Sequence, residues 1–167
     1  MLINVTGDGK GKSTSAFGTV VRALGWGWQV TLLQFVKGEL ETGEVRFFRN
    51  LRQDNFVFEQ LGAGLSWHPG NHKELAQSGW LKAMKLLHDP NLQLLVLDEL
   101  NIALHLGYLD MDEVVNALAH RRKDLHVMVT GRYAHEKLLA ISDLISDIHA
   151  LKHPFEQGEE AQKGIDY

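Results

Sequence analysis

The chain opens on an apolar run that leads into a glycine-rich turn, Leu2-Ile3-Asn4-Val5-Thr6 followed by Gly7-Asp8-Gly9-Lys10-Gly11-Lys12-Ser13-Thr14. The run predicts a strand, and the apolar spacing of Ser13 to Leu24 predicts an amphipathic helix directly after the turn. We expect Gly25 to end this helix as a C-cap glycine. A glycine turn between a strand and a helix is the setting in which backbone N–H groups bind phosphate.

The residues of the turn support this interpretation. The alternating glycines of Gly7 to Gly11 allow backbone amides to form an anion nest, and Lys12 adds a mobile cation. The Ser13 hydroxyl stands where a Mg²⁺ bridging two phosphates would bind. The segment is a variant of G-x-x-x-x-G-K-[ST], because Thr6 replaces the first glycine, and Lys12 at the third glycine of G-x-G-x-x-G disfavours an NAD site. A turn without ligand is the alternative, which the lysines inside the turn disfavour.

Further apolar runs alternate with segments of helical period, which is typical of βαβ units. The sequence therefore predicts an α/β fold, a P-loop NTPase-type three-layer sandwich with a mainly parallel sheet of about six strands. We expect residues 1–167 to form a single domain. The additional predicted strands are Val30–Val36, Phe56–Leu61, Leu92–Leu97, Leu125–Thr130 and Ile145–Leu151, and the additional predicted helices are Glu74–Leu87 and Asp112–Leu118.

Composition narrows the class of protein. The formal net charge of −4 over 167 residues gives no global basic field for nucleic acid. The absence of cysteine excludes disulfides, thiolate metal sites and a cysteine nucleophile, and is compatible with a reducing compartment. The start of the chain lacks a signal-peptide pattern, and no apolar run approaches the about 20 residues that cross a bilayer. We expect a cytoplasmic protein with neither nucleic acid nor membrane as a partner.

The predicted strand Leu92–Leu97 ends in two carboxylates, Asp98 and Glu99. An acidic side chain at such a strand tip is the second signature of phosphate-loop proteins, where it holds the metal. We expect this strand end to lie beside that of the first strand, so that both carboxylates reach a Mg²⁺ on Ser13. Capping of a following helix is the alternative role. The pattern leaves open whether Glu99 also activates water.

Along nearly its whole length the chain resembles the phosphate-loop class of corrinoid adenosyltransferases, the ATP:cob(I)alamin enzymes of cobalamin synthesis and salvage. Ordered segments spread over the chain carry the resemblance. They are Gly7–Thr14, Gln34-Phe35-Val36-Lys37-Gly38, Trp67 after a glycine-rich stretch, Leu97-Asp98-Glu99-Leu100, Thr130-Gly131-Arg132, Lys152-His153-Pro154-Phe155 and Ala161-Gln162-Lys163-Gly164-Ile165-Asp166-Tyr167.

The resemblance implies transfer of the 5′-deoxyadenosyl group of ATP to the Co(I) of a reduced corrinoid, with release of triphosphate. It also implies that ATP lies reversed in the turn, so that C5′ faces the corrin. ATP and the corrinoid are then substrates and Mg²⁺ the cofactor. The resemblance implies that Lys12 is the main phosphate contact. It implies that Ser13 and Glu99 are metal ligands, with Asp98 in support. It also implies further contacts to the nucleotide, from Gly7, Asp8, Gly9, Lys10, Gly11, Thr14, Lys37 and Arg132.

On the same grounds Trp67 is the corrin candidate, an apolar side chain wedged beneath the ring that would exclude water and favour four-coordinate cobalt. Family members often carry an aromatic residue two positions earlier, where this chain has Leu65. Anchoring of its loop on the core is the alternative role of Trp67. The resemblance further implies a homodimer, and it leaves the reductant open, with a flavoprotein as a candidate.

Two other functions compete with adenosyl transfer. A generic P-loop ATPase or small-molecule kinase using Glu99 as base would cleave the γ-phosphate without a corrinoid. A non-catalytic ATP-dependent binding switch would bind ATP and a protein partner with negligible turnover. Release of triphosphate separates adenosyl transfer from both alternatives.

Overall fold

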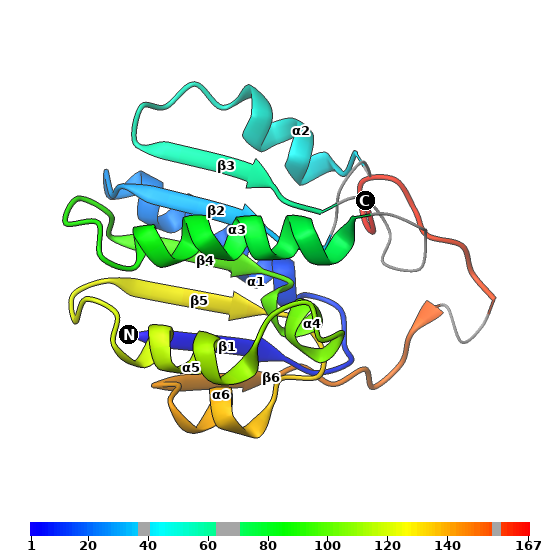
Figure 1. Ribbon diagram of the computed structural model, residues 1–167. Helices are drawn as coiled ribbons and strands as arrows, with labels where there is room; N and C mark the ends of the chain where they lie inside the picture. Colours follow the sequence, from blue (N-terminus) through cyan, green and yellow to red (C-terminus); the bar gives the residue numbers. More distant parts are fainter. Residues whose placement is uncertain (37–40, 63–70, 155–157) are drawn as a thin grey trace.

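The computed structural model describes residues 1–36, 41–62, 71–154 and 158–167 (Figure 1). A six-stranded sheet in the order β3-β2-β4-β5-β1-β6 forms its centre, and every neighbouring pair is parallel. The predicted parallel sheet is confirmed. The strands are β1 Leu2–Thr6, β2 Val30–Gln34, β3 Phe56–Gln60, β4 Leu94–Asp98, β5 His126–Thr130 and β6 Leu144–Asp147.

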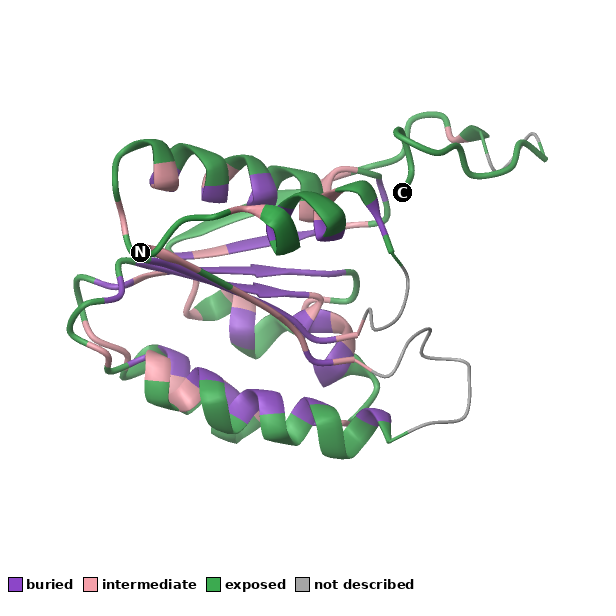
Figure 2. Cartoon of the chain, turned by 90° about the horizontal axis from the view of Figure 1, so that it is seen from above, coloured by how far each residue is buried: buried purple, intermediate pink, exposed green. Residues whose placement is uncertain are grey.

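Helices cover both faces of the sheet, which confirms the three-layer sandwich (Figure 2). One apolar cluster joins one face of the sheet to α1 and α2, and the other joins the opposite face to α3, α4, α5 and α6. Burial of two separate apolar faces explains why the central strands read as nearly continuous apolar runs. The helices are α1 Lys12–Gly25, α2 Gly43–Asn50, α3 His72–Leu86, α4 Leu100–His105, α5 Met111–Ala119 and α6 Glu136–Ala140.

The end of α1 corrects one expectation. Gly25 is the last helical residue and Trp26 is the C-cap, so the prediction of Gly25 as the C-cap was wrong. Gly27 carries the left-handed backbone, with φ 74°. The amides of Trp26 and Gly27 donate to the carbonyls of Ala23 and Leu24 at 3.0 and 2.9 Å, so the helix tightens for one turn before glycine reverses the chain.

The sheet order corrects a second expectation. β5 lies between β4 and β1, so the carboxyl end of β4 is not the immediate neighbour of that of β1. Both ends still meet at the same edge of the sheet, since all the strands are parallel. The glycine turn, α4 and the C-terminal segment gather at this edge (Figure 1). Among the described residues, no helix combines the length and apolarity needed to cross a membrane.

Candidate functional site

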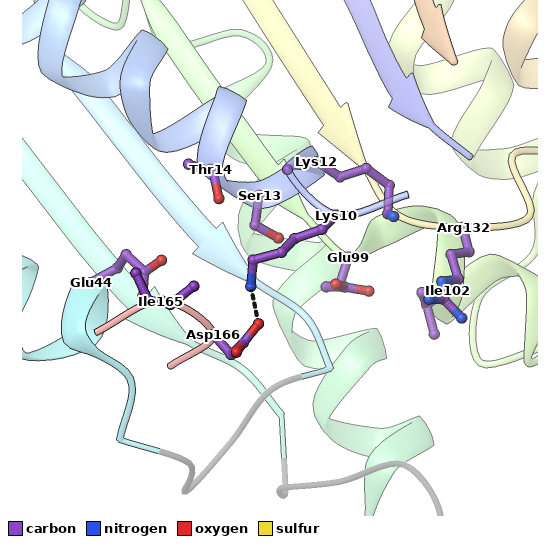
Figure 3. Close-up of a pocket in the computed structure, with 11 residues that line it drawn as sticks. Lys10, Lys12, Ser13, Thr14, Glu44, Glu99, Ile102, Arg132, Ile165 and Asp166 are labelled. Atoms are coloured by element: carbon purple, nitrogen blue, oxygen red, sulfur yellow. Dashed lines mark hydrogen bonds and ion pairs between the residues drawn. The ribbon is translucent and has the colours of Figure 1, made fainter. Parts of the chain in front are cut away.

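A cavity of about 320 Å³ lies at the carboxyl edge of the sheet (Figure 3). The glycine turn, the first turn of α1, α2, the end of β4, α4, the segment after β5 and the C-terminal segment all contribute to it. Ligand sites of parallel α/β sheets lie at this edge. The lining residues are Lys10, Gly11, Lys12, Ser13, Thr14, Glu44, Glu99, Ile102, Arg132, Ile165 and Asp166.

The glycines of the turn have a packing role that the sequence did not reveal. Gly7 has φ 97°, and a Cβ atom there would lie 2.4 Å from the carbonyl oxygen of Ile148. A Cβ atom at Gly9 would lie 2.8 Å from the carbonyl carbon of His149, and the Gly9 amide donates to the Ile148 carbonyl at 2.7 Å. Both glycines therefore let the segment after β6 pack directly on the turn.

The turn divides into two parts. Its second half, Lys10 to Thr14, lines the cavity, whereas Gly7, Asp8 and Gly9 are not among the lining residues. The amides able to face a phosphate are thus those at the start of α1, where the helix dipole adds positive potential. Contact of Gly7, Asp8 and Gly9 with the nucleotide stays a prediction.

Three cationic side chains from distant parts of the chain line the same cavity. Lys12 Nζ donates to the Gly9 carbonyl at 2.6 Å, and Arg132 Nη2 donates to the Asp8 carbonyl at 3.2 Å. Lys10 pairs with the carboxylate of Asp166, which also lines the cavity. Each of these cations can contact an oxygen of a polyanion, and the carboxylates that line the same cavity balance their formal charge.

The two neighbouring carboxylates lie in different environments. Asp98 is fully buried, and its Oδ1 and Oδ2 accept hydrogen bonds from Thr130 Oγ1 at 2.6 Å and Gln34 Nε2 at 2.9 Å. Glu99 lines the cavity and adopts a left-handed backbone, with φ 63° and ψ 18°. Such a conformation costs a non-glycine residue about 1–2 kcal/mol and is typical of functional positions. The Glu99 side chain accepts no hydrogen bond that would cap α4, which disfavours the alternative role of Glu99 as a helix cap.

Ser13 and Glu99 fit a Mg²⁺ site by the chemistry of their donors. Both line the cavity, and they offer a hydroxyl and a carboxylate, the hard oxygen ligands that Mg²⁺ prefers (Figure 3). Mg²⁺ commonly takes one or two protein ligands and completes its shell with substrate phosphates and water. Asp98 fits a supporting role beside this metal site and not that of a direct ligand, because both of its carboxylate oxygens already accept hydrogen bonds from protein groups.

Four lining residues carried no role in the sequence interpretation: Glu44, Ile102, Ile165 and Asp166. The pKa of Asp166 is lowered, first by the hydrogen bond from the Gln162 amide and then by Lys10. Glu44 gave no signal, since α2 was not predicted. Ile165 and Asp166 belong to the terminal segment that supports the resemblance, and that was their only signal. The predicted site residues Lys37, Leu65 and Trp67 lie outside the described residues.

A glycine turn between β1 and α1, convergent cations and a carboxylate at the tip of β4 define a phosphate-loop nucleotide-binding protein. The family model described as ATP:corrinoid adenosyltransferase BtuR/CobO/CobP matches residues 1–167, and the chain belongs to this family.

Curated proteins named corrinoid adenosyltransferase are similar to this chain over its whole length. A corrinoid adenosyltransferase of Pseudomonas aeruginosa is 41% identical over 170 residues, which cover 100% of this chain and 83% of the relative. That of Escherichia coli K12 is 39% identical over 171 residues and covers 100% and 85% of the two chains. The corrinoid adenosyltransferase CobA of Salmonella typhimurium has the same identity and coverage. The predicted family is confirmed.

Proposed function

We propose that this chain transfers the 5′-deoxyadenosyl group of ATP to the cobalt of a reduced corrinoid and releases triphosphate. Family membership over the full length supports the reaction. The observation that carries the proposal at the level of residues is that Lys10, Lys12 and Arg132 line the same cavity as Ser13 and Glu99. A triphosphate leaving group is stabilised by cations and N–H donors placed against its oxygens.

The reaction forms one bond and breaks one. Co(I) attacks the ribose C5′, a Co–C bond forms, and the bond between C5′ and the triphosphate oxygen breaks. The cobalt supplies both electrons of the new bond and is formally oxidised to Co(III), and the electron pair of the broken bond remains on triphosphate. No proton has to be abstracted, so the reaction needs no general base, and Glu99 is left for the metal-binding role that the resemblance implies.

Stabilisation of the departing triphosphate is the chief task of the protein. Lys12 and Lys10 provide cations, and the residues at the start of α1, which line the cavity, provide backbone N–H donors. Ser13 and Glu99 would hold Mg²⁺, which supplies further neutralisation of the phosphate oxygens when bound. Positive charge placed before the reaction costs no reorganisation when the bond breaks.

The remaining predictions rest on the resemblance. ATP lies with its C5′ toward the corrin, and Trp67 with Leu65 excludes water beneath the ring. Lys37 contacts phosphate or ribose. The protein acts as a homodimer, and a flavoprotein is the candidate reductant. A cytoplasmic location rests instead on the composition of the chain.

Product analysis tests the proposal. The protein is incubated with ATP, MgCl₂ and chemically reduced cobalamin, and the corrinoid and phosphate products are separated by chromatography. We expect adenosylated corrinoid and triphosphate in equal amounts. ADP and phosphate without a cobalt–carbon product would instead indicate an ATPase or kinase, and tight ATP binding with no product would indicate a binding switch.

A further inference from the structure

A series of hydrogen bonds joins the carboxyl ends of four neighbouring strands, β3, β2, β4 and β5. Gln60 Nε2 donates to Gln34 Oε1 at 3.1 Å, and Gln34 Nε2 donates to Asp98 Oδ2 at 2.9 Å. From the other side, Thr130 Oγ1 donates to Asp98 Oδ1 at 2.6 Å. The donors from both sides converge on Asp98, which makes its carboxylate the common acceptor of the series.

Burial makes this arrangement rigid. Gln34, Asp98 and Thr130 are 2%, 0% and 0% exposed, so water does not compete for their polar atoms. A carboxylate offers only acceptors, and the single proton of the Thr130 hydroxyl is therefore committed to Asp98. The lone pairs of the same hydroxyl remain available as acceptors. The amide of Glu99, the residue after Asp98, donates to Thr130 Oγ1 at 3.0 Å.

The hydrogen bond from Glu99 to Thr130 fixes a strained residue. Glu99 has a left-handed backbone, and on its other side its carbonyl accepts from the amides of Ile102 and Ala103 at 3.1 and 3.2 Å. The residue is thus held through its amide by β5 and through its carbonyl by α4. A strained conformation persists only where its surroundings hold it from several sides.

We propose that Thr130 is a positioning residue, which couples the buried Asp98 carboxylate to the Glu99 backbone and so directs the Glu99 carboxylate into the cavity. The inference rests on the proposed function, in which Glu99 binds Mg²⁺. It gives Asp98 a defined role in support of the metal site, as the fixed acceptor that orients the Thr130 hydroxyl. Thr130 itself is not among the cavity-lining residues and acts through Glu99.

The test compares Thr130→Val, which replaces the hydroxyl by a methyl group, with Thr130→Ser, which keeps the hydroxyl. Calorimetry measures ATP binding in EDTA and in MgCl₂, and the ratio of the two dissociation constants reports how strongly bound metal and nucleotide support each other. Thr31→Val is the matched control, since Thr31 is also a buried threonine of the sheet and lies outside the cavity lining.

We expect Thr130→Val to lower this ratio about five- to tenfold while the dissociation constant in EDTA stays within about twofold of the wild-type value. Thr130→Ser and Thr31→Val should keep the ratio within about twofold. An unchanged ratio in Thr130→Val would overturn the proposal, and so would a loss in Thr130→Ser as large as that in Thr130→Val.

Folding and the role of Glu99 need their own measurements. If Thr130→Val shows no cooperative thermal unfolding, Thr130→Ala replaces it, because alanine removes the hydroxyl without placing a methyl group against Asp98. Failure of both variants to fold would assign the hydroxyl to the fold alone and overturn the proposal.

In Glu99→Gln a lowered ratio is expected. If Glu99→Gln lowers the ratio and Thr130→Val does not, the present inference fails while the proposed function stands; an unchanged ratio in Glu99→Gln removes the metal role of Glu99 itself.

Discussion

Lys10 and Asp166, 156 positions apart in the chain, form an ion pair at the cavity (Figure 3). The pair joins the C-terminal segment to the glycine turn, and Ile165 and Asp166 line the cavity together with Lys10. A carboxylate on this ammonium group competes with phosphate for the same cation. The C-terminal segment is therefore expected to influence nucleotide affinity.

Asp166→Asn should strengthen ATP binding, because it frees Lys10 and removes a negative charge from a polyanion site. Both partners are partly exposed, so we expect a modest increase of about two- to fivefold that shrinks at high salt. Calorimetric titration with ATP and MgCl₂ measures it. Asp112→Asn, which breaks a surface ion pair with Lys137, is the control. Weaker binding in Asp166→Asn would mean that the carboxylate serves the nucleotide directly.

Lys12→Ala should weaken nucleotide binding about ten- to a hundredfold, the usual cost of losing a hydrogen bond to a charged group. Lys12 lines the cavity at the start of α1, where its ammonium can follow the phosphates. The dissociation constant of ATP in MgCl₂ measures the loss. Lys82→Ala provides the control, since Lys82 pairs with Glu59 outside the cavity lining. Equal affinities of Lys12→Ala and the wild type would remove Lys12 from the phosphate site.

Trp67→Ala should spare ATP affinity and impair adenosylation that starts from Co(II), because loss of the apolar wedge admits water to the lower face of the corrin. This prediction rests on the family resemblance. Turnover from Co(II) with a reductant is compared with turnover from Co(I) prepared beforehand. An equal loss with both cobalt states would speak for a general role in corrin binding or in loop anchoring.

Gly7→Ala should destabilise the protein by about 3 kcal/mol, because φ is 97° there and the added Cβ would meet the backbone of Ile148. Gly18→Ala is the matched comparison. Gly18 lies within α1 with nothing within 4 Å of an added Cβ, and alanine there should stabilise by about 0.5–1 kcal/mol. Denaturant unfolding measures both. Equal stabilities of the two variants would refute the close approach of the turn to the segment after β6.

Asp143→Asn should lower stability in a pH-dependent way. The Leu2 amide, which donates to Asp143 Oδ2 at 2.6 Å, and then Arg121 at 3.1 Å lower the pKa of this carboxyl from its ordinary value of 3.8. A lowered pKa in the folded state gives stability that is complete above the unfolded pKa and is lost as the pH falls through the folded pKa. Unfolding at pH 7 and pH 3 checks this, and a difference between variant and wild type that is the same at both values would contradict it.

Much of the architecture followed from local pattern. The strand ends differed from their predicted positions by only a few residues, because apolar runs bounded by glycine or acidic residues mark buried parallel strands. The helices α2, α4 and α6 were not predicted. They span eight, six and five residues, too few to display a helical period clearly.

The sequence predicted the candidate site only in part. Lys10, Lys12, Ser13, Glu99 and Arg132 were predicted and line one cavity. Glu44 and Asp166 were missed, since each reaches the cavity through tertiary packing and carries no motif of its own. The different environments of Asp98 and Glu99 were not predicted either, because they depend on where β4 ends and on the left-handed backbone of Glu99, which no local pattern shows.

The order of residues along the chain was sufficient to predict a glycine turn suited to phosphate and a parallel sheet, since glycine spacing and apolar period are local properties. Its ordered motifs carried the resemblance to the family. Folding established which side chains share a cavity and which carboxylate is buried. The hydrogen bonds responsible join residues 32 and 64 positions apart, Asp98 to Thr130 and to Gln34, and form only when the carboxyl ends of neighbouring strands meet. Such contacts depend on strand order, and strand order is a property of the assembled sheet.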